Sequence, residues 1–241
     1  MSETLDKLVK EAHEGKVVYH VSRDSTAVEA REKLEKKEKT EKKRCERPKK
    51  GENRSPKEET VIGKQIHETT EESLKNINTS CVHGYRKNRH GNIQFWTGYK
   101  LHLDVSDCRF PLGAFVSGAT VYDSQPACDT TGKDDRGGIF SCYSLMDVAY
   151  DSSVIDGFIR SRERIPLIDP NNRGSETRPP LDPVKKERFK LRTEVERANS
   201  ILKDWFLPRK LYVKGPAKVS FVVLIAVVCL AALRMIQYFV L

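Results

Sequence analysis

Two neighbouring segments with the alternating pattern of β-strands place the strongest constraint on the fold. Aromatic and aliphatic residues alternate with polar ones in residues 94–106 (QFWTGYKLHLDVS), and residues 112–122 (LGAFVSGATVY) repeat the pattern after the turn at Pro111. A period of two places the apolar side chains on one face of a sheet. Because only a short turn separates the two segments, we expect them to pair as an antiparallel hairpin or meander.

The patterns elsewhere predict further strands and helices in alternation. Residues 16–26 begin with β-branched and aromatic side chains and predict an earlier strand; residues 139–146 predict a buried strand and residues 166–168 a short one. Residues 123–128 (DSQPAC) have the pattern of a helix start, and from residue 184 to 206 the apolar period becomes helical. This order of elements indicates an α/β fold with an antiparallel start.

The long predicted helix carries two stripes of side chains. At about 100° per residue, one stripe should face the core, and it consists of Leu191, Val195, Ala198, Leu202 and Trp205. A second stripe lies beside it and consists of Phe189, Arg192, Glu196 and Lys203. Spacing alone would assign this second stripe to a solvent-exposed face.

A strongly charged stretch separates the first predicted strand from the second. Between Lys42 and Lys57 there are eight basic residues and only two acids. Such low hydrophobicity cannot offset the entropy lost on ordering, so we expect residues 30–89 to form a basic, largely disordered insertion. An arm that contacts DNA phosphates through residues 42–57 remains open beside a simple solvated charge run.

An apolar segment occupies the C-terminal end of the sequence. Residues 219–233 are apolar apart from Ser220, and the apolar run resumes after Arg234. A membrane span needs roughly 20 apolar residues. Arg234 would lie inside such a span at a cost of about 3 kcal/mol. We therefore expect residues 214–241 to form an apolar helix packed on the core, with a membrane anchor as the alternative.

Charge and cysteine content indicate the class of partner and the redox compartment of the protein. The chain carries 43 Lys and Arg against 34 Asp and Glu, and this net charge of +9 suits a polyanionic partner, either nucleic acid or an anionic membrane surface. The six cysteines form no CxxC pair and no zinc-ligand spacing, and the first sixteen residues are too polar for a secretory signal. These features favour a reducing, cytosolic compartment with free thiols.

Three acids end or face predicted elements in positions where they could converge. Asp24 closes the first strand, Asp147 follows a later strand, and Glu196 lies on the long helix. Carboxylates are the hard oxygen ligands with which phosphoryl transfer enzymes hold Mg²⁺ ions. Each acid also has an ordinary structural explanation: a turn for Asp24, a cap for Asp147, and a surface pair with Arg192 for Glu196.

At these residues the chain resembles the DDE transposases of bacterial insertion sequences. The last motif of that family is Tyr, two residues, Arg, three residues, Glu, six residues, Lys. Here every spacing is kept by Phe189, Arg192, Glu196 and Lys203, with Phe in place of Tyr. The second motif, Asp-x-Gly/Ala-Tyr/Phe, appears as Asp147-Val148-Ala149-Tyr150, and the first as Asp24-Ser25-Thr26. The similarity extends from about residue 17 to residue 233 and includes GYKLHLD and VYDSQPA.

The resemblance implies a ribonuclease-H-like fold, a mixed sheet flanked by helices, with the basic insertion after the first strand. It implies that Asp24, Asp147 and Glu196 are catalytic ligands of two Mg²⁺ (or Mn²⁺) ions, and that water and then a 3′-hydroxyl act as nucleophiles. The DNA-contacting residues that it implies are Arg192, Lys203, Phe189 and Tyr150. Asp104 is a rival for the first acid, because it too lies in a predicted strand.

The expected organisation is a tail over residues 1–16, a catalytic core over 17–29 and 90–213, the insertion over 30–89, and the C-terminal helix over 214–241. By resemblance, the partners are insertion-sequence ends and target DNA, with a homodimer in full-length members of the family, in the cytoplasm on the nucleoid. Full transposases of this kind carry a sizeable segment before the first catalytic strand, so a truncated copy is expected. The alternatives are an inert DNA-binding remnant, a membrane-tethered basic protein, and a nuclease on the same fold.

Overall fold

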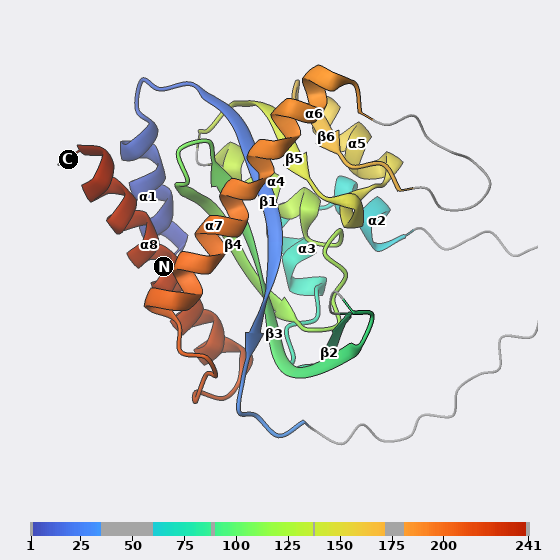
Figure 1. Cartoon of the computed structure of the whole chain (residues 1–241), viewed down its shortest axis with the longest axis vertical. Helices are drawn as coiled ribbons and strands as arrows, with labels where there is room; N and C mark the ends of the chain where they lie inside the picture. The colour runs from blue at the N-terminus through green and yellow to red at the C-terminus, as the bar shows by residue number, and fades with distance from the viewer. Residues whose placement is uncertain (1, 35–59, 88–89, 137, 172–180, 240–241) are drawn as a thin grey trace, which may run out of the picture.

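A six-stranded mixed sheet organises the chain, with helices on both of its faces (Figure 1). The computed structural model describes residues 2–34, 60–87, 90–136, 138–171 and 181–239. The strand order is β2-β3-β1-β5-β6, and β4 also pairs with β3. The strands are β1 (Val18–Glu29), β2 (Val82–Lys87), β3 (Ile93–Ser106), β4 (Pro111–Gly118), β5 (Ser141–Met146) and β6 (Ile165–Ile168).

Antiparallel and parallel pairings divide this sheet into two halves. β3 pairs antiparallel with β1, β2 and β4, so the meander expected from residues 94–122 is present. β5 lies parallel to β1 on one side and to β6 on the other. The predicted fold class, a mixed sheet flanked by helices as in ribonuclease-H-like domains, is confirmed.

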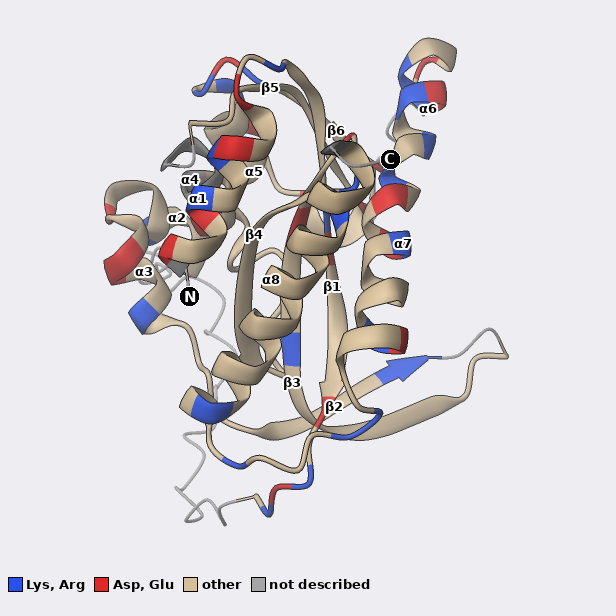
Figure 2. Cartoon of the chain, turned by 90° about the vertical axis from the view of Figure 1, so that its left-hand side faces the viewer, with Lys and Arg blue, Asp and Glu red and all other residues tan. Residues whose placement is uncertain are grey.

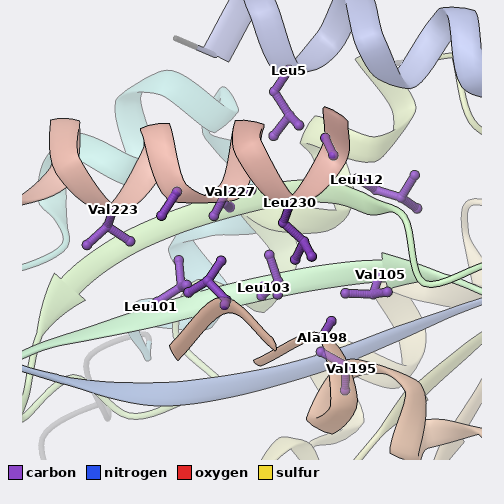
Figure 3. Close-up of a cluster of buried hydrophobic side chains, with 14 of the residues drawn as sticks. Leu5, Leu101, Leu103, Val105, Leu112, Val195, Ala198, Val223, Val227 and Leu230 are labelled. Atoms are coloured by element: carbon purple, nitrogen blue, oxygen red, sulfur yellow. The ribbon is translucent and has the colours of Figure 1, made fainter. Parts of the chain in front are cut away.

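Helices cover the two faces of the sheet in separate groups (Figure 1). On one face α7 (Thr193–Ile201) packs against β1 and β3, while α1 (Ser2–His13) and α8 (Pro216–Phe239) pack against each other and against β4. The other face carries α4 (Ala127–Arg136), with α2 (Val61–His67), α3 (Thr70–Asn76) and α5 (Ser153–Arg160) packed around it. The main core lies under the first group, where side chains of β3, α7 and α8 meet (Figure 3).

The inner side of α8 is part of this core. Val223, Val227 and Leu230 are buried and lie against the strands in Figure 3. By length and composition alone α8 is also a candidate membrane span. Its buried side explains why so apolar a helix forms in a folded domain, since each buried Val or Leu side chain contributes about 1.5–3 kcal/mol.

The first sixteen residues are not the expected tail, because residues 2–13 form α1. Leu5, Val9 and Ala12 are spaced to share one side of a helix and are buried against the core. That apolar spacing is visible in the sequence and would have predicted the helix.

The expected insertion is more ordered than its composition suggested. Residues 35–59, including the basic tract 42–57, lie outside the described residues. The expectation of disorder is wrong for residues 60–87, which form α2, α3 and β2. Local features explain the order: Thr69 and Glu72 form a reciprocal capping box at α3, and β2 gains a full antiparallel partner in β3.

The long helix predicted over residues 184–206 consists of four consecutive pieces. They are α6 (Pro183–Phe189), the 3₁₀ segment η2 (Lys190–Arg192), α7, and the π-helical segment η3 (Leu202–Phe206). Of the predicted core stripe, Val195, Ala198 and Leu202 are buried, whereas Leu191 is 41% and Trp205 72% exposed. The π-helical turn takes more residues than an α-turn, so it rotates Trp205 out of the stripe.

Candidate active site

Asp24 and Asp147 lie near each other where the parallel pairing of β1 and β5 ends. The last pair of this ladder is Ser22 of β1 with Leu145 of β5; Asp24 lies two residues further along β1, and Asp147 is the first residue after β5. Side chains two residues apart point to the same face, and adjacent strands lie about 4.8 Å apart. The hydroxyl of Ser22 donates to the carbonyl of Leu191 at 3.4 Å, which identifies this face as the one covered by the long helix.

Glu196 lies on α7, the helix that packs against β1 and β3 on this face of the sheet. Its Oε1 accepts a hydrogen bond from Nη2 of Arg192 at 2.7 Å, the surface pair that the spacing allowed. The Arg192 guanidinium also lies over the ring of Phe189, 5.8 Å from the ring centroid. Phe189, which stands where the family motif has tyrosine, therefore contacts Arg192 through its ring face.

The charges of Asp147 and Glu196 both act on Asp24. The pKa of Asp24 is raised to about 6, first by burial and then by these two negative charges, against the opposing effects of the Ser25 amide and Arg192. The pKa of Asp147 is also raised, first by burial, although its Oδ1 accepts a hydrogen bond from the Ala149 amide at 2.8 Å. The three acids thus share one site in which negative charge is crowded.

Lys203, in η3 at the end of the long helix, lies near Asp24. Its pKa lies below the ordinary value, first because surrounding atoms exclude water and then because Arg86 of β2 is close, while Asp24 acts in the opposite direction. Arg192, Glu196 and Lys203 of the second stripe therefore all lie near Asp24, and Phe189 lies against Arg192. Arg86 was not expected there, because nothing local in the sequence shows that β2 folds back beside the helix.

The site's chemistry fits a divalent cation, but its arrangement is not that of a ready-made metal centre. Carboxylate oxygens in a crowded negative site are suitable ligands for Mg²⁺. Across the described ranges, no group of three or more His, Cys, Asp or Glu side chains is close enough to hold an ion. Glu196 is engaged by Arg192, and Asp147 caps η1 (Val148–Tyr150). Joint ligation would require Glu196 to leave Arg192.

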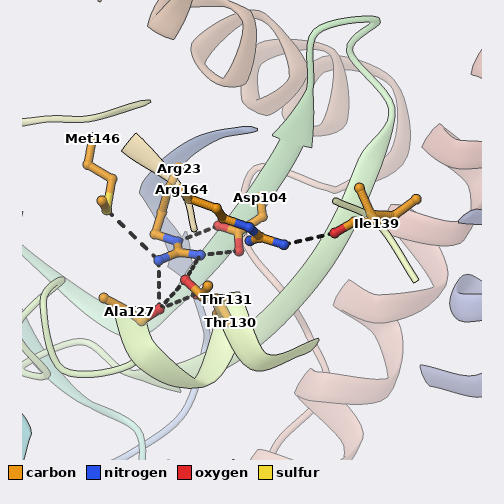
Figure 4. Close-up of polar contacts among 8 residues, drawn as sticks. All are labelled: Arg23, Asp104, Ala127, Thr130, Thr131, Ile139, Met146 and Arg164. Carbon is orange, nitrogen blue, oxygen red and sulfur yellow. Dashed lines mark hydrogen bonds and ion pairs between the residues drawn. The ribbon is translucent and has the colours of Figure 1, made fainter. Parts of the chain in front are cut away.

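Asp104, the rival for the first acid, has a structural role instead. It is fully buried and accepts two hydrogen bonds from Arg23, Nε to Oδ1 and Nη2 to Oδ2, each at 2.6 Å (Figure 4). Arg23 also donates to the Ala127 carbonyl at 2.6 Å and to the Thr131 hydroxyl at 2.9 Å. This network joins the sheet to α4 on the face opposite Asp24, because Arg23 and Asp24 alternate along β1.

Tyr150 is buried, so the expectation that it contacts DNA is wrong. Its side chain is 1% exposed and packs with Met146, Ile155 and Ile159. Burial raises its pKa well above the ordinary value. The aromatic position of the second motif therefore anchors the segment after β5 and so fixes the backbone that carries Asp147.

Further acids that sequence reasoning missed lie around Asp147. Asp123 and Asp169 both raise its pKa. Asp123 pairs with Lys100, whose Nζ lies 2.8 Å from its Oδ1. The sequence features that included Asp123 were the helix start expected at residues 123–128 and the similarity of VYDSQPA to a family segment, and neither gave the acid a role in the site; the helix itself begins at Ala127.

Asp24 should make folding stability depend on pH. Its pKa rises from 3.8 in the unfolded chain to about 6 in the folded protein, so the folded state holds this proton more tightly. Stability should therefore fall as pH rises from about 4 to 6, by roughly 2–3 kcal/mol from this group. Urea denaturation of wild type and Asp24→Asn across this range measures it. We expect Asp24→Asn to be the more stable protein at pH 7, and equal stabilities there would contradict the burial of a charged Asp24.

Comparison with known proteins gives one match. A sequence model of the family described as "Transposase DDE domain" matches residues 19–232. Searches against curated proteins and against solved structures gave no match. The matched range includes all of β1 except Val18, the long helix and all three acids of the candidate site.

Proposed function

Because the chain belongs to the transposase DDE domain family, whose members are DNA-cleaving enzymes, we propose that it cuts and joins DNA at Asp24, Asp147 and Glu196. One observation carries the assignment: the parallel register of β1 and β5 brings Asp24 and Asp147 near each other beneath the helix that bears Glu196. The substrate would be the ends of an insertion sequence and its target DNA.

In this proposal the three carboxylates hold Mg²⁺ or Mn²⁺. The bound cations would lower the pKa of a water molecule and balance charge on the phosphate under attack. Burial and the neighbouring acids favour the protonated form of Asp24, so Asp24 must lose this proton before its carboxylate can bind a cation. Asp147 stays fixed by its bond to the Ala149 amide, which leaves its second oxygen for ligation.

The two cations of the second stripe would position the DNA. Lys203 lies beside Asp24, so its ammonium can bind a phosphate that enters the site. Arg192 is paired with Glu196 and becomes available to a phosphate when Glu196 turns to a cation. Phe189 supports the guanidinium during this exchange through its ring face. Binding of metal and binding of DNA would therefore favour each other.

Nicking of supercoiled plasmid tests the proposal. The chain should convert plasmid to the open-circular form in Mg²⁺ or Mn²⁺, and an excess of EDTA should abolish the conversion. An inert DNA-binding remnant would retain DNA affinity in a gel-shift assay and nick in neither buffer, and that result would contradict the proposed activity.

A further inference from the structure

Exposed aromatic side chains gather at the end of the sheet where β1 finishes. They are Tyr85 of β2, Phe95 of β3 and Tyr212 in the loop before α8, and they are 72%, 75% and 67% exposed. Rings this exposed contribute little to the core, and a cluster of them indicates a contact surface. We call this surface the aromatic end; in Figure 2 it lies at the bottom, around β2 and the finish of β1.

Backbone pairing and ring contacts bring these segments together. Tyr85 and Phe95 are cross-strand partners in the β2–β3 ribbon, so their rings lie on the same face. The Arg31 amide donates to the Leu211 carbonyl at 2.9 Å, and the Arg31 guanidinium lies 4.5 Å from the centroid of the Tyr212 ring. A cavity of about 420 Å³ opens between these parts, and its lining includes Phe95, Trp96, Arg31, Lys33 and Lys210.

The charge of the aromatic end favours a polyanion. Arg31, Lys33 and Lys210 line the cavity, and Arg86 lies close to Lys203, on the path toward Asp24. The acids nearby are engaged: Glu32 accepts hydrogen bonds from the Tyr99 hydroxyl and the Gly215 amide. The carboxylate of Glu29 lies 3.6 Å from the Lys210 ammonium.

Aromatic faces and cations together fit single-stranded DNA better than duplex. The bases of a duplex are stacked on one another, so ring faces reach them only where the strand is unpaired. Unpaired bases can stack on exposed aromatic rings while basic side chains contact the phosphates. A strand that leaves Asp24 past Lys203 would reach the β2–β3 ribbon, where Arg86 lies on one face and Tyr85 and Phe95 lie on the other.

We propose that the aromatic end binds an unpaired stretch of the DNA strand that leaves the candidate active site. Bases stack on Phe95, Tyr85 and Tyr212, and phosphates contact Arg31 and Lys33, which line the cavity beside Phe95. The inference rests on the proposed function for the nature of the partner, since it takes DNA as the molecule in the site.

Binding of a fluorescein-labelled oligo-dT of about a dozen nucleotides, followed by anisotropy in EDTA, tests this site without cleavage. Phe95→Ala should weaken binding about tenfold, and Phe95→Ala with Tyr212→Ala should weaken it further. The matched control is Tyr19→Ala, because Tyr19 is 60% exposed at the opposite end of β1. It should bind as wild type does, and melting temperatures verify that each variant is folded.

Two results would overturn the inference. One is an affinity of the double variant for oligo-dT equal to that of wild type. The other is an equal loss of affinity for a blunt duplex, which would make the aromatic end a duplex contact. The two assays separate this inference from the proposed function, because oligo-dT binding in EDTA requires neither metal nor cleavage. If plasmid nicking fails but ring-dependent binding persists, the catalytic proposal falls and the binding site stands.

Discussion

Asp24→Asn should lower the rate of metal-dependent plasmid nicking about a thousandfold, corresponding to roughly 4 kcal/mol of transition-state stabilisation. An amide keeps the size of the side chain but removes the negative charge that holds a cation. Asp147→Asn and Glu196→Gln should have effects of similar size, because the three carboxylates act as one unit. The rate of open-circle formation in Mn²⁺, at equal concentrations of folded protein, measures the effect.

Asp156→Asn provides the matched control for these substitutions. Asp156 forms an exposed pair with Arg160 on α5 and does not contribute to the shifted pKa of Asp24. It should nick plasmid at the wild-type rate. Wild-type nicking by Asp24→Asn would disprove the assignment of the first acid.

Asp104→Ala should destabilise the fold by about 3–5 kcal/mol, because it leaves the Arg23 guanidinium buried without its countercharge. Both side chains are nearly inaccessible, with 5% of Arg23 and none of Asp104 exposed. The free energy of unfolding in urea measures the loss. Asp156→Ala, which breaks an exposed pair, should change stability by no more than about 0.5–1 kcal/mol.

A double substitution separates the charge from the packing at this position. Arg23→Met with Asp104→Leu removes both charges and retains most of the volume, so it should recover much of the stability that Asp104→Ala loses. If Asp104→Ala were as stable as wild type, the buried pair would have no role in holding α4 on the sheet. Loss of nicking by Asp104→Ala at temperatures where it remains folded would revive Asp104 as a candidate for the first acid.

The strands and the long helix were predictable because their patterns are local. Alternation over residues 94–106 and the helical period over 184–206 survive in β3 and in α6 to η3. α1 was predictable in the same way, since Leu5, Val9 and Ala12 show the required spacing between its charged residues. The composition of residues 60–87 favours disorder, but side-chain caps stabilise α2 and α3, and pairing with β3 stabilises β2.

The acids of the site could be proposed from motifs, but their arrangement could not. Nothing local pairs Ser22 with Leu145 or Arg23 with Asp104; these contacts arise when distant strands come into register. For the same reason the sequence left Asp24 and Asp104 as rivals, and only the alternation of faces along β1 separates them. The burial of Tyr150 was equally hidden, because its motif position resembles that of a DNA-contacting residue.

Cleavage of the protein backbone by bound iron tests the central claim most directly, that one cation site is shared by the three acids. Fe²⁺ with ascorbate and peroxide generates radicals that cut the chain beside the ion, and mass spectrometry locates the cuts. The account predicts cuts near residues 24, 147 and 196 together, suppressed by excess Mg²⁺ and absent in Asp24→Asn. Cuts confined to other parts of the chain, or an unchanged pattern in Asp24→Asn, would contradict it.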